Sequence, residues 1–119
     1  MGHGVRGKIS PAKRKKVYDK CGGHCAYCGC KLAYEDMQVD HKKPISQGGS
    51  DTIKNMLSAC RSCNHRKGSS SLESFREQVE HFPAVLDRDS VTYKNAVRFG
   101  LVIPNPHKVT FYFEKENVS

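Results

Sequence analysis

Residues 39–68 hold the side chains of this chain that are best suited to chemistry. They include a carboxylate, an imidazole and two amides, on Asp40, His41, Asn55 and Asn64. Hydrolysis of a phosphodiester requires an activated water, neutralisation of the phosphate charge and assistance to the leaving oxygen. A neutral His can take a proton from water near pH 7, and oxygen ligands can hold a hard divalent cation. The combination predicts a metal-assisted hydrolase.

Asp40 and His41 are neighbours on a predicted strand, where adjacent side chains point to opposite faces. The simpler arrangement therefore gives the carboxylate to the metal and leaves the imidazole to activate water. The amides of Asn55 and Asn64 can hold the His in one tautomer or add an oxygen ligand to the metal. Taken singly, each residue also has a structural interpretation as a capping, surface or turn residue.

Two Cys-x-x-Cys pairs, Cys25/Cys28 and Cys60/Cys63, flank these residues. Four thiolates around a tetrahedral zinc ion would pin both ends of the segment between them. That segment has 31 residues, more than the roughly 15–20 of a common zinc ribbon, so we expect it to contain structure of its own. Cys21 and Cys30 remain as competing ligands. The alternative is that the cysteines are free thiols without metal, but the two separate Cys-x-x-Cys pairs would then be a coincidence.

Net charge limits the class of partner. The chain of 119 residues has a formal charge of +8 and a pI of about 9.3. Residues 1–31 carry eight Lys or Arg against the single acid Asp19, whereas the remainder is near neutral. This asymmetry favours a polyanion such as nucleic acid, the alternative being a solubilising surface. No apolar segment reaches the roughly 20 residues of a membrane span, and no secretory signal is predicted, so we expect a cytoplasmic location.

Helix and strand signals predict a small α+β fold. Ser10-Pro11 should begin a basic helix that ends near Gly22-Gly23. Strands near residues 37–41 and 56–60, followed by a helix from Arg61, would form a β-β-α unit.

Apolar spacing predicts further helix from residue 72, and Ser90 should cap another short helix that Gly100 ends. Residues 109–113, VTFYF, have the composition of a strand. We expect a flexible tail at residues 1–9 and a single domain over 10–119, with its β-β-α core at about 37–68 and a C-terminal extension at 72–119.

In these residues the chain resembles the HNH endonucleases of the ββα-metal fold. Asp40-His41 precede a Gly-rich loop, Asn55 heads the second strand, and CRSCNHRKG follows from Cys60 to Gly68. The four-cysteine branch of that family, which is phage- or restriction-like, has the pattern C-x-x-C, DH-x-x-P-x-x-x-GG, N and C-x-x-C-N-x-x-K-G. The sequence matches this pattern from Cys25 to Gly68.

The resemblance implies a role for each matching residue. His41 would be the general base that activates water, and Asp40 and Asn64 would hold a catalytic Mg²⁺ or Mn²⁺. Asn55 would fix the loop and orient His41. His65, beside Asn64, is a minor candidate ligand. The four paired cysteines would hold a structural Zn²⁺.

The resemblance further implies cleavage or nicking of DNA, expected to be double-stranded, leaving 5′-phosphate and 3′-hydroxyl ends. The expected phosphate contacts are the basic residues of the first helix, the loop and the last helix of the core: Lys13, Arg14, Lys15, Lys16, Lys20, Lys42, Lys43, Arg66 and Lys67. Two alternatives remain open, a non-catalytic zinc-containing nucleic-acid-binding module and an RNA-cleaving HNH nuclease. The sequence does not separate phage packaging, restriction and mobile-element settings.

Overall fold

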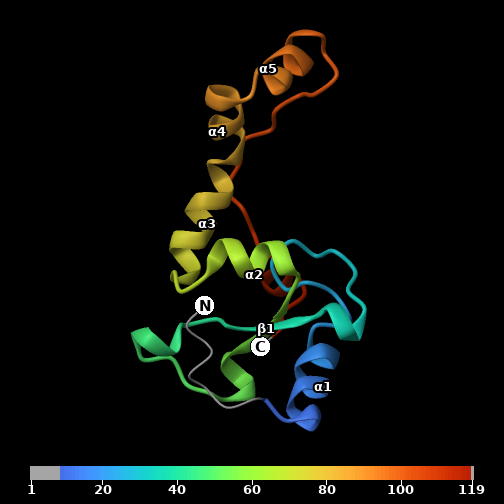
Figure 1. The fold of residues 1–119 in the computed structure, drawn as a ribbon, viewed down its shortest axis with the longest axis vertical. Helices are drawn as coiled ribbons and strands as arrows, with labels where there is room; N and C mark the ends of the chain where they lie inside the picture. The colour runs from blue at the N-terminus through green and yellow to red at the C-terminus, as the bar shows by residue number, and fades with distance from the viewer. Residues whose placement is uncertain (1–8, 119) are drawn as a thin grey trace. The chain divides into compact units, whose positions relative to one another are not determined.

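A computed structural model describes residues 9–118 of the chain, which form two compact units (Figure 1). The first unit is Met1–Leu72 with Thr110–Ser119, and the second is Glu73–Val109. The flexible tail expected at residues 1–9 lies, apart from Ile9, outside the described residues. In the described part of the chain, no helix is long and apolar enough to cross a membrane.

A two-stranded antiparallel sheet and one helix make the centre of the first unit. Strand β1 (Gln38–His41) pairs with β2 (Met56–Ala59), so that Asp40 lies opposite Leu57. Helix α2 (Arg61–Lys67) follows β2 directly and packs on β1. The β-β-α unit predicted from the sequence, and with it the α+β class, is therefore confirmed. Three short 3₁₀ turns complete the segment: η2 (Tyr34–Asp36), η3 (Ile45–Gln47) and η4 (Ile53–Asn55).

Helix α1 (Pro11–Lys20) precedes this centre and begins as the sequence predicts. The Ser10 hydroxyl accepts a hydrogen bond from the Lys13 amide at 3.2 Å, and Pro11 occupies the first helical position. Val17, on the one buried position of the helix, packs with Met37 and Met56 in the core. A largely basic helix is thus anchored by one apolar side chain.

The strand predicted at residues 109–113 is wrong. The backbone amides of Tyr112 and Phe113 donate to the carbonyl oxygens of Tyr27 and Ala26, and helix α6 (Tyr112–Lys115) follows at once. The Glu114 carboxylate accepts from the Phe111 amide at 2.8 Å, which starts the helix. The aromatic residues that gave the segment its β-propensity pack around Tyr27 instead.

Helices α3 (Leu72–Glu80), α4 (Phe82–Asp89) and α5 (Val91–Arg98) lie largely in the second unit. The apolar pattern from residue 72 predicts helix through this region, and the structure divides it at His81. Pro83 lacks an amide proton and is tolerated only in the first turn of a helix, so a new helix starts there. The Ser90 hydroxyl caps α5 by accepting from the Tyr93 amide, as predicted.

Candidate active site

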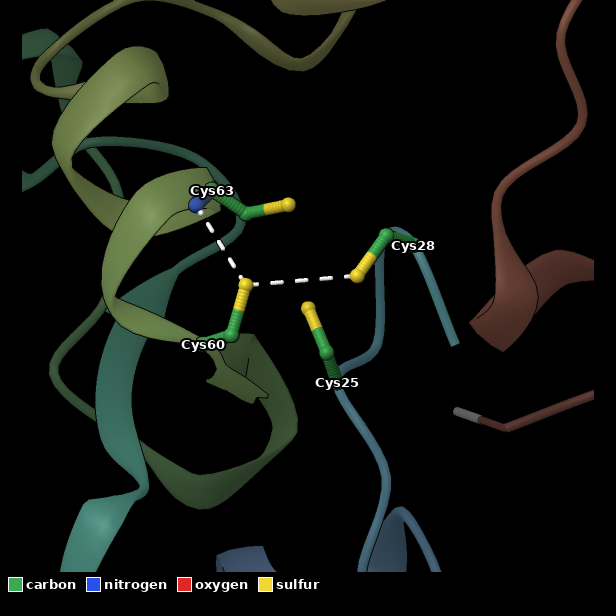
Figure 2. A group of neighbouring side chains, drawn as sticks. All are labelled: Cys25, Cys28, Cys60 and Cys63. Atoms are coloured by element: carbon green, nitrogen blue, oxygen red, sulfur yellow. Dashed lines mark hydrogen bonds between the residues drawn. The ribbon is translucent and has the colours of Figure 1, made fainter. Parts of the chain in front are cut away.

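The four paired cysteines come together in the first unit, and we call them the four-cysteine cluster (Figure 2). Cys25 and Cys28 lie on a turn, whereas Cys60 is the N-cap of α2 and Cys63 lies in its first turn. Their sulfur atoms all lie within 4.8 Å of one another, and those of Cys28 and Cys60 are 3.9 Å apart. Zinc–sulfur bonds of about 2.3 Å at tetrahedral angles place sulfurs about 3.8 Å apart. The cluster therefore has the donor set and the spacing of a structural zinc site.

The pKa values of the clustered thiols also fit a metal site. The pKa of Cys25 falls to about 4, chiefly because the Cys63 thiol donates a hydrogen bond to its sulfur. The pKa of Cys63 rises, first because it is that donor and then because of burial. Closely packed thiols hold their protons between them, and a divalent cation is what lets all four ionise together.

The two remaining cysteines lie outside the cluster. Cys21 is buried at the C-cap of α1, and Cys30 is exposed two residues beyond Cys28. In residues 9–118, all six cysteines are free thiols, and the cluster is the one group of three or more His, Cys, Asp or Glu side chains close enough to share an ion.

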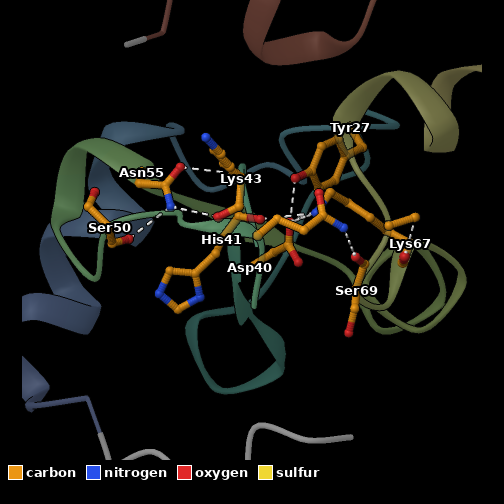
Figure 3. Close-up of polar contacts among 10 residues, drawn as sticks. Tyr27, Asp40, His41, Lys43, Ser50, Asn55, Lys67 and Ser69 are labelled. Carbon is orange, nitrogen blue, oxygen red and sulfur yellow. Dashed lines mark hydrogen bonds and ion pairs between the residues drawn. The ribbon is translucent and has the colours of Figure 1, made fainter. Parts of the chain in front are cut away.

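Asp40 is buried on the side of β1 that faces α2 (Figure 3). Its Oδ2 accepts a hydrogen bond from the Tyr27 hydroxyl at 2.5 Å and lies 3.1 Å from the Lys67 ammonium. Lys67 is itself 2% exposed and also donates to the His41 carbonyl oxygen at 3.0 Å. The ion pair with a buried cation and the hydrogen bond from a hydroxyl offset the desolvation cost of burying this carboxylate. A phosphate contact by Lys67 would require its ammonium to leave Asp40.

Asn64 lies at the same interface as Asp40. Its side-chain amide donates to Gln38 Oε1 at 2.5 Å, and Gln38 is two residues before Asp40, on the same face of β1. Lys67 follows Asn64 by three residues, nearly one turn of α2. Two side-chain pairs therefore span the interface between β1 and α2: Gln38 with Asn64, and Asp40 with Lys67. His65 is exposed on α2.

The imidazole of His41 leaves β1 in a different direction from the Asp40 carboxylate (Figure 3). The ring nitrogen Nε2 lies 2.8 Å from Oδ1 of Asp51, a half-exposed carboxylate in the loop after the glycines. The sequence prediction missed Asp51, because nothing in the spacing of a loop Asp ten residues downstream indicates that it returns to the histidine.

Asn55 closes the loop between the strands. Its side chain accepts from the Lys43 amide at 3.0 Å and donates to the Lys43 and Ser50 carbonyl oxygens at 2.9 and 2.8 Å (Figure 3). Gly49 is required in the same loop, since a Cβ there would lie 1.9 Å from the Lys43 carbonyl oxygen. Asn55 thus joins the two sides of the loop that carries Asp51.

Several predicted phosphate contacts have structural partners. Arg14 donates to the carbonyl oxygens of Tyr34 and Met37, and Lys20 donates to those of Ile53 and Met56, so both tie α1 to the rest of the unit. Lys15 pairs with Asp19, and the Lys13 ammonium donates to the Asp51 carbonyl oxygen at 3.4 Å. The Lys42 ammonium lies 5.5 Å from the centroid of the Phe113 ring. The remaining side chains, Lys16, Lys43 and Arg66, are exposed.

The sequence model of the HNH endonuclease family matches residues 25–70. This HNH segment begins at the first cysteine of the cluster and ends just after α2, so it contains every candidate catalytic and metal-binding residue named above. Helix α1 and the second unit lie outside it.

Two Cas9 proteins are similar to part of the chain. The CRISPR-associated endonuclease Cas9 of Corynebacterium diphtheriae is 34% identical over 67 residues, which is 54% of this chain and 6% of that protein. The crystal structure of the Type II-C Cas9 enzyme from Actinomyces naeslundii matches with a TM-score of 0.53 and 26% identity. That match covers 66% of this chain and 8% of the other. The chain therefore spans only a small fraction of the length of either relative.

Proposed function

We propose that this chain is a metal-dependent nuclease that hydrolyses DNA phosphodiester bonds. The observation that carries the proposal is the arrangement around β1: a buried carboxylate on one side and a carboxylate-bound imidazole on the other, in an HNH segment with a four-cysteine cluster. In this proposal, adjacent residues of one strand supply the ion ligand and the base.

His41 is the proposed general base. We assign the proton on its Nε2 to the hydrogen bond with Asp51, so that Nδ1 is the nitrogen that takes a proton from the attacking water. Asp51 fixes the ring orientation and stabilises the imidazolium that forms, as a carboxylate behind a catalytic histidine does. Asn55 supports this pair by holding the loop.

Asp40 and Asn64 are the proposed ligands of the catalytic ion. Carboxylate and amide oxygens are hard donors, and Mg²⁺ or Mn²⁺ takes few protein ligands and keeps several waters, so this pair suits either ion. When bound, such an ion neutralises charge on the phosphate and assists the leaving 3′-oxygen. The four-cysteine cluster, which has soft donors and no open position, is the proposed zinc site and has a structural role.

Double-stranded DNA is the proposed substrate. The net charge of +8 favours a polyanion, and we assign phosphate contacts first to the exposed side chains of Lys16 and Lys43. Single-strand and RNA readers stack bases on exposed aromatic rings. Here Phe111 and Phe113 are buried with Tyr27 and cannot stack with bases, whereas Phe99 in the second unit is 80% exposed. The choice of duplex DNA over RNA therefore rests on the first unit, which carries the candidate site.

Plasmid cleavage tests the proposal. Supercoiled DNA is incubated with the wild type, His41→Ala and the control His107→Ala, each with Mg²⁺ or Mn²⁺. We expect the wild type and His107→Ala to nick or linearise the plasmid, and His41→Ala to be slower by roughly 10²- to 10⁴-fold, the usual worth of a general base. His107 is an exposed histidine of the second unit.

Two outcomes would replace the proposal with its alternatives. A wild type that leaves plasmid uncut with every divalent ion, yet retards it on a gel, is a binding module. Cleavage of a labelled RNA in a parallel reaction, with plasmid left intact, would make RNA the substrate.

A further inference from the structure

Tyr27 lies between the two cysteines of the turn and is buried. Its ring meets those of Phe111 and Phe113 edge-on, with centroids 5.2 and 6.2 Å away. Its hydroxyl donates to Asp40 Oδ2, which connects the turn of the four-cysteine cluster to β1 (Figure 3).

The contacts of Asp40 distinguish its two oxygens. The Tyr27 hydroxyl and the Lys67 ammonium both meet Oδ2. No neighbour in residues 9–118 donates to Oδ1, and in the same part of the chain no fully buried side-chain oxygen or nitrogen lacks a hydrogen-bond partner. Oδ1 therefore reaches solvent although the residue is only 6% exposed. One oxygen of the carboxylate is anchored, and the other is open to a ligand.

We infer that Tyr27 is a positioning residue that anchors Oδ2 of Asp40 so that Oδ1 is presented to the catalytic ion. The inference rests on the proposed function, in which Asp40 is an ion ligand. Because Tyr27 belongs to the turn that carries Cys25 and Cys28, it also makes the placement of that ligand depend on the four-cysteine cluster. Tyr27 thus joins the two metal sites through one hydroxyl.

A core aromatic residue with no such role would act through its ring alone. Ring packing and hydroxyl can be separated, because Tyr27→Phe keeps the edge-on contacts and removes only the donor. Phe111→Leu does the reverse, since it loosens the packing and leaves the hydroxyl in place. Tyr18→Phe is the matched control, because it removes a 2.7 Å hydrogen bond from a tyrosine hydroxyl to the Leu32 carbonyl oxygen elsewhere in the same unit.

The test measures Mn²⁺ binding by the zinc-loaded full chain. Electron paramagnetic resonance reports the concentration of the free ion. Zinc content and thermal unfolding are measured on the same samples, and Asp40→Asn defines the binding that belongs to the site. We expect Tyr27→Phe to keep its zinc and to bind Mn²⁺ about 10- to 100-fold more weakly, the usual effect of losing a partner of a metal ligand. Tyr18→Phe and Phe111→Leu should bind Mn²⁺ as the wild type does.

The outcomes that overturn the inference are distinct. If Asp40→Asn loses Mn²⁺ while Tyr27→Phe retains wild-type affinity, the inference fails and the proposed function stands. If Phe111→Leu weakens Mn²⁺ as much as Tyr27→Phe, or if Tyr27→Phe loses zinc in step with Mn²⁺, the residue acts through packing. If the wild type binds no more Mn²⁺ than Asp40→Asn, the proposed ion site and the inference fail together.

Discussion

The four-cysteine cluster and the Asp40–Asn64 pair are two sites built from the same helix in opposite ways. The cluster contains four protein ligands, gathered within 4.8 Å, and offers no place for a substrate. In the proposed function the pair would contribute two oxygen ligands, and other residues hold both side chains: Tyr27 and Lys67 hold Asp40, and Gln38 holds Asn64. A complete ligand set defines a structural site, whereas an incomplete, externally anchored set leaves positions for water and substrate.

Helix α2 connects the two. Its first residues carry Cys60 and Cys63, and its next turn carries Asn64 and Lys67 toward β1. Disrupting the cluster should therefore disturb the oxygen pair, whereas changes at the pair should leave the cluster intact. The predictions below test this one-way dependence, from the largest expected effect to the smallest.

Replacing Cys60 by Ser should have the largest effect. Structural zinc contributes roughly 10–16 kcal/mol of apparent binding energy in small zinc domains, comparable to the total stability of a domain of about 5–15 kcal/mol. We expect Cys60→Ser to lose zinc, to melt roughly 15 °C or more below the wild type, and to lose cleavage. Zinc content by colorimetry and unfolding by circular dichroism measure the first two.

Cys30→Ser is the matched control, because Cys30 is an exposed cysteine next to Cys28 and Cys60 that is not one of the four in the cluster. It should keep the zinc stoichiometry and melting temperature of the wild type. Full cleavage activity in a zinc-free Cys60→Ser protein would show that the oxygen pair does not depend on the cluster. Loss of zinc in Cys30→Ser would place Cys30 among the zinc ligands.

Replacing Asn55 by Ala should have a smaller effect confined to the loop. The change removes three hydrogen bonds to backbone groups of Lys43 and Ser50. These bonds are exposed, so the freed groups can bond to water, and we expect a net cost of about 0.5–1.5 kcal/mol. We expect that loss in urea unfolding and a slower cleavage rate, with zinc retained. Asn95→Ala, which removes an exposed bond to Arg98 in the second unit, should be close to neutral. Wild-type stability and cleavage in Asn55→Ala would show that the loop does not depend on this side chain.

Local patterns account for what the sequence predicted. The Ser10-Pro11 start of α1, the two strands and α2, and the two cysteine pairs each depend on residues a few positions apart. The prediction of a strand at 109–113 was wrong because the conformation of this segment depends on distant backbone groups, at Ala26 and Tyr27, and on the capping residue Glu114.

The candidate site divides in the same way. Asp40, His41, Asn55 and Asn64 were found by type and spacing, whereas the partners that hold them were not. Tyr27 is 13 residues from Asp40, and Gln38 is 26 from Asn64, so their side-chain contacts exist only once the strand, the helix and the turn are packed together. A motif identifies which groups perform chemistry, and the fold determines which groups hold them.

The cleavage rate of zinc-loaded protein as a function of added Mn²⁺ tests the separation of the two sites most directly. The protein is freed of other ions on a chelating resin, its zinc is counted, and supercoiled plasmid is the substrate, with Asp40→Asn assayed in parallel. We predict one zinc per chain, no cleavage until Mn²⁺ is added, and no rescue of Asp40→Asn at any Mn²⁺ concentration that saturates the wild type. Cleavage by the zinc-loaded protein with no second ion, or a wild-type rate in Asp40→Asn, would contradict the account.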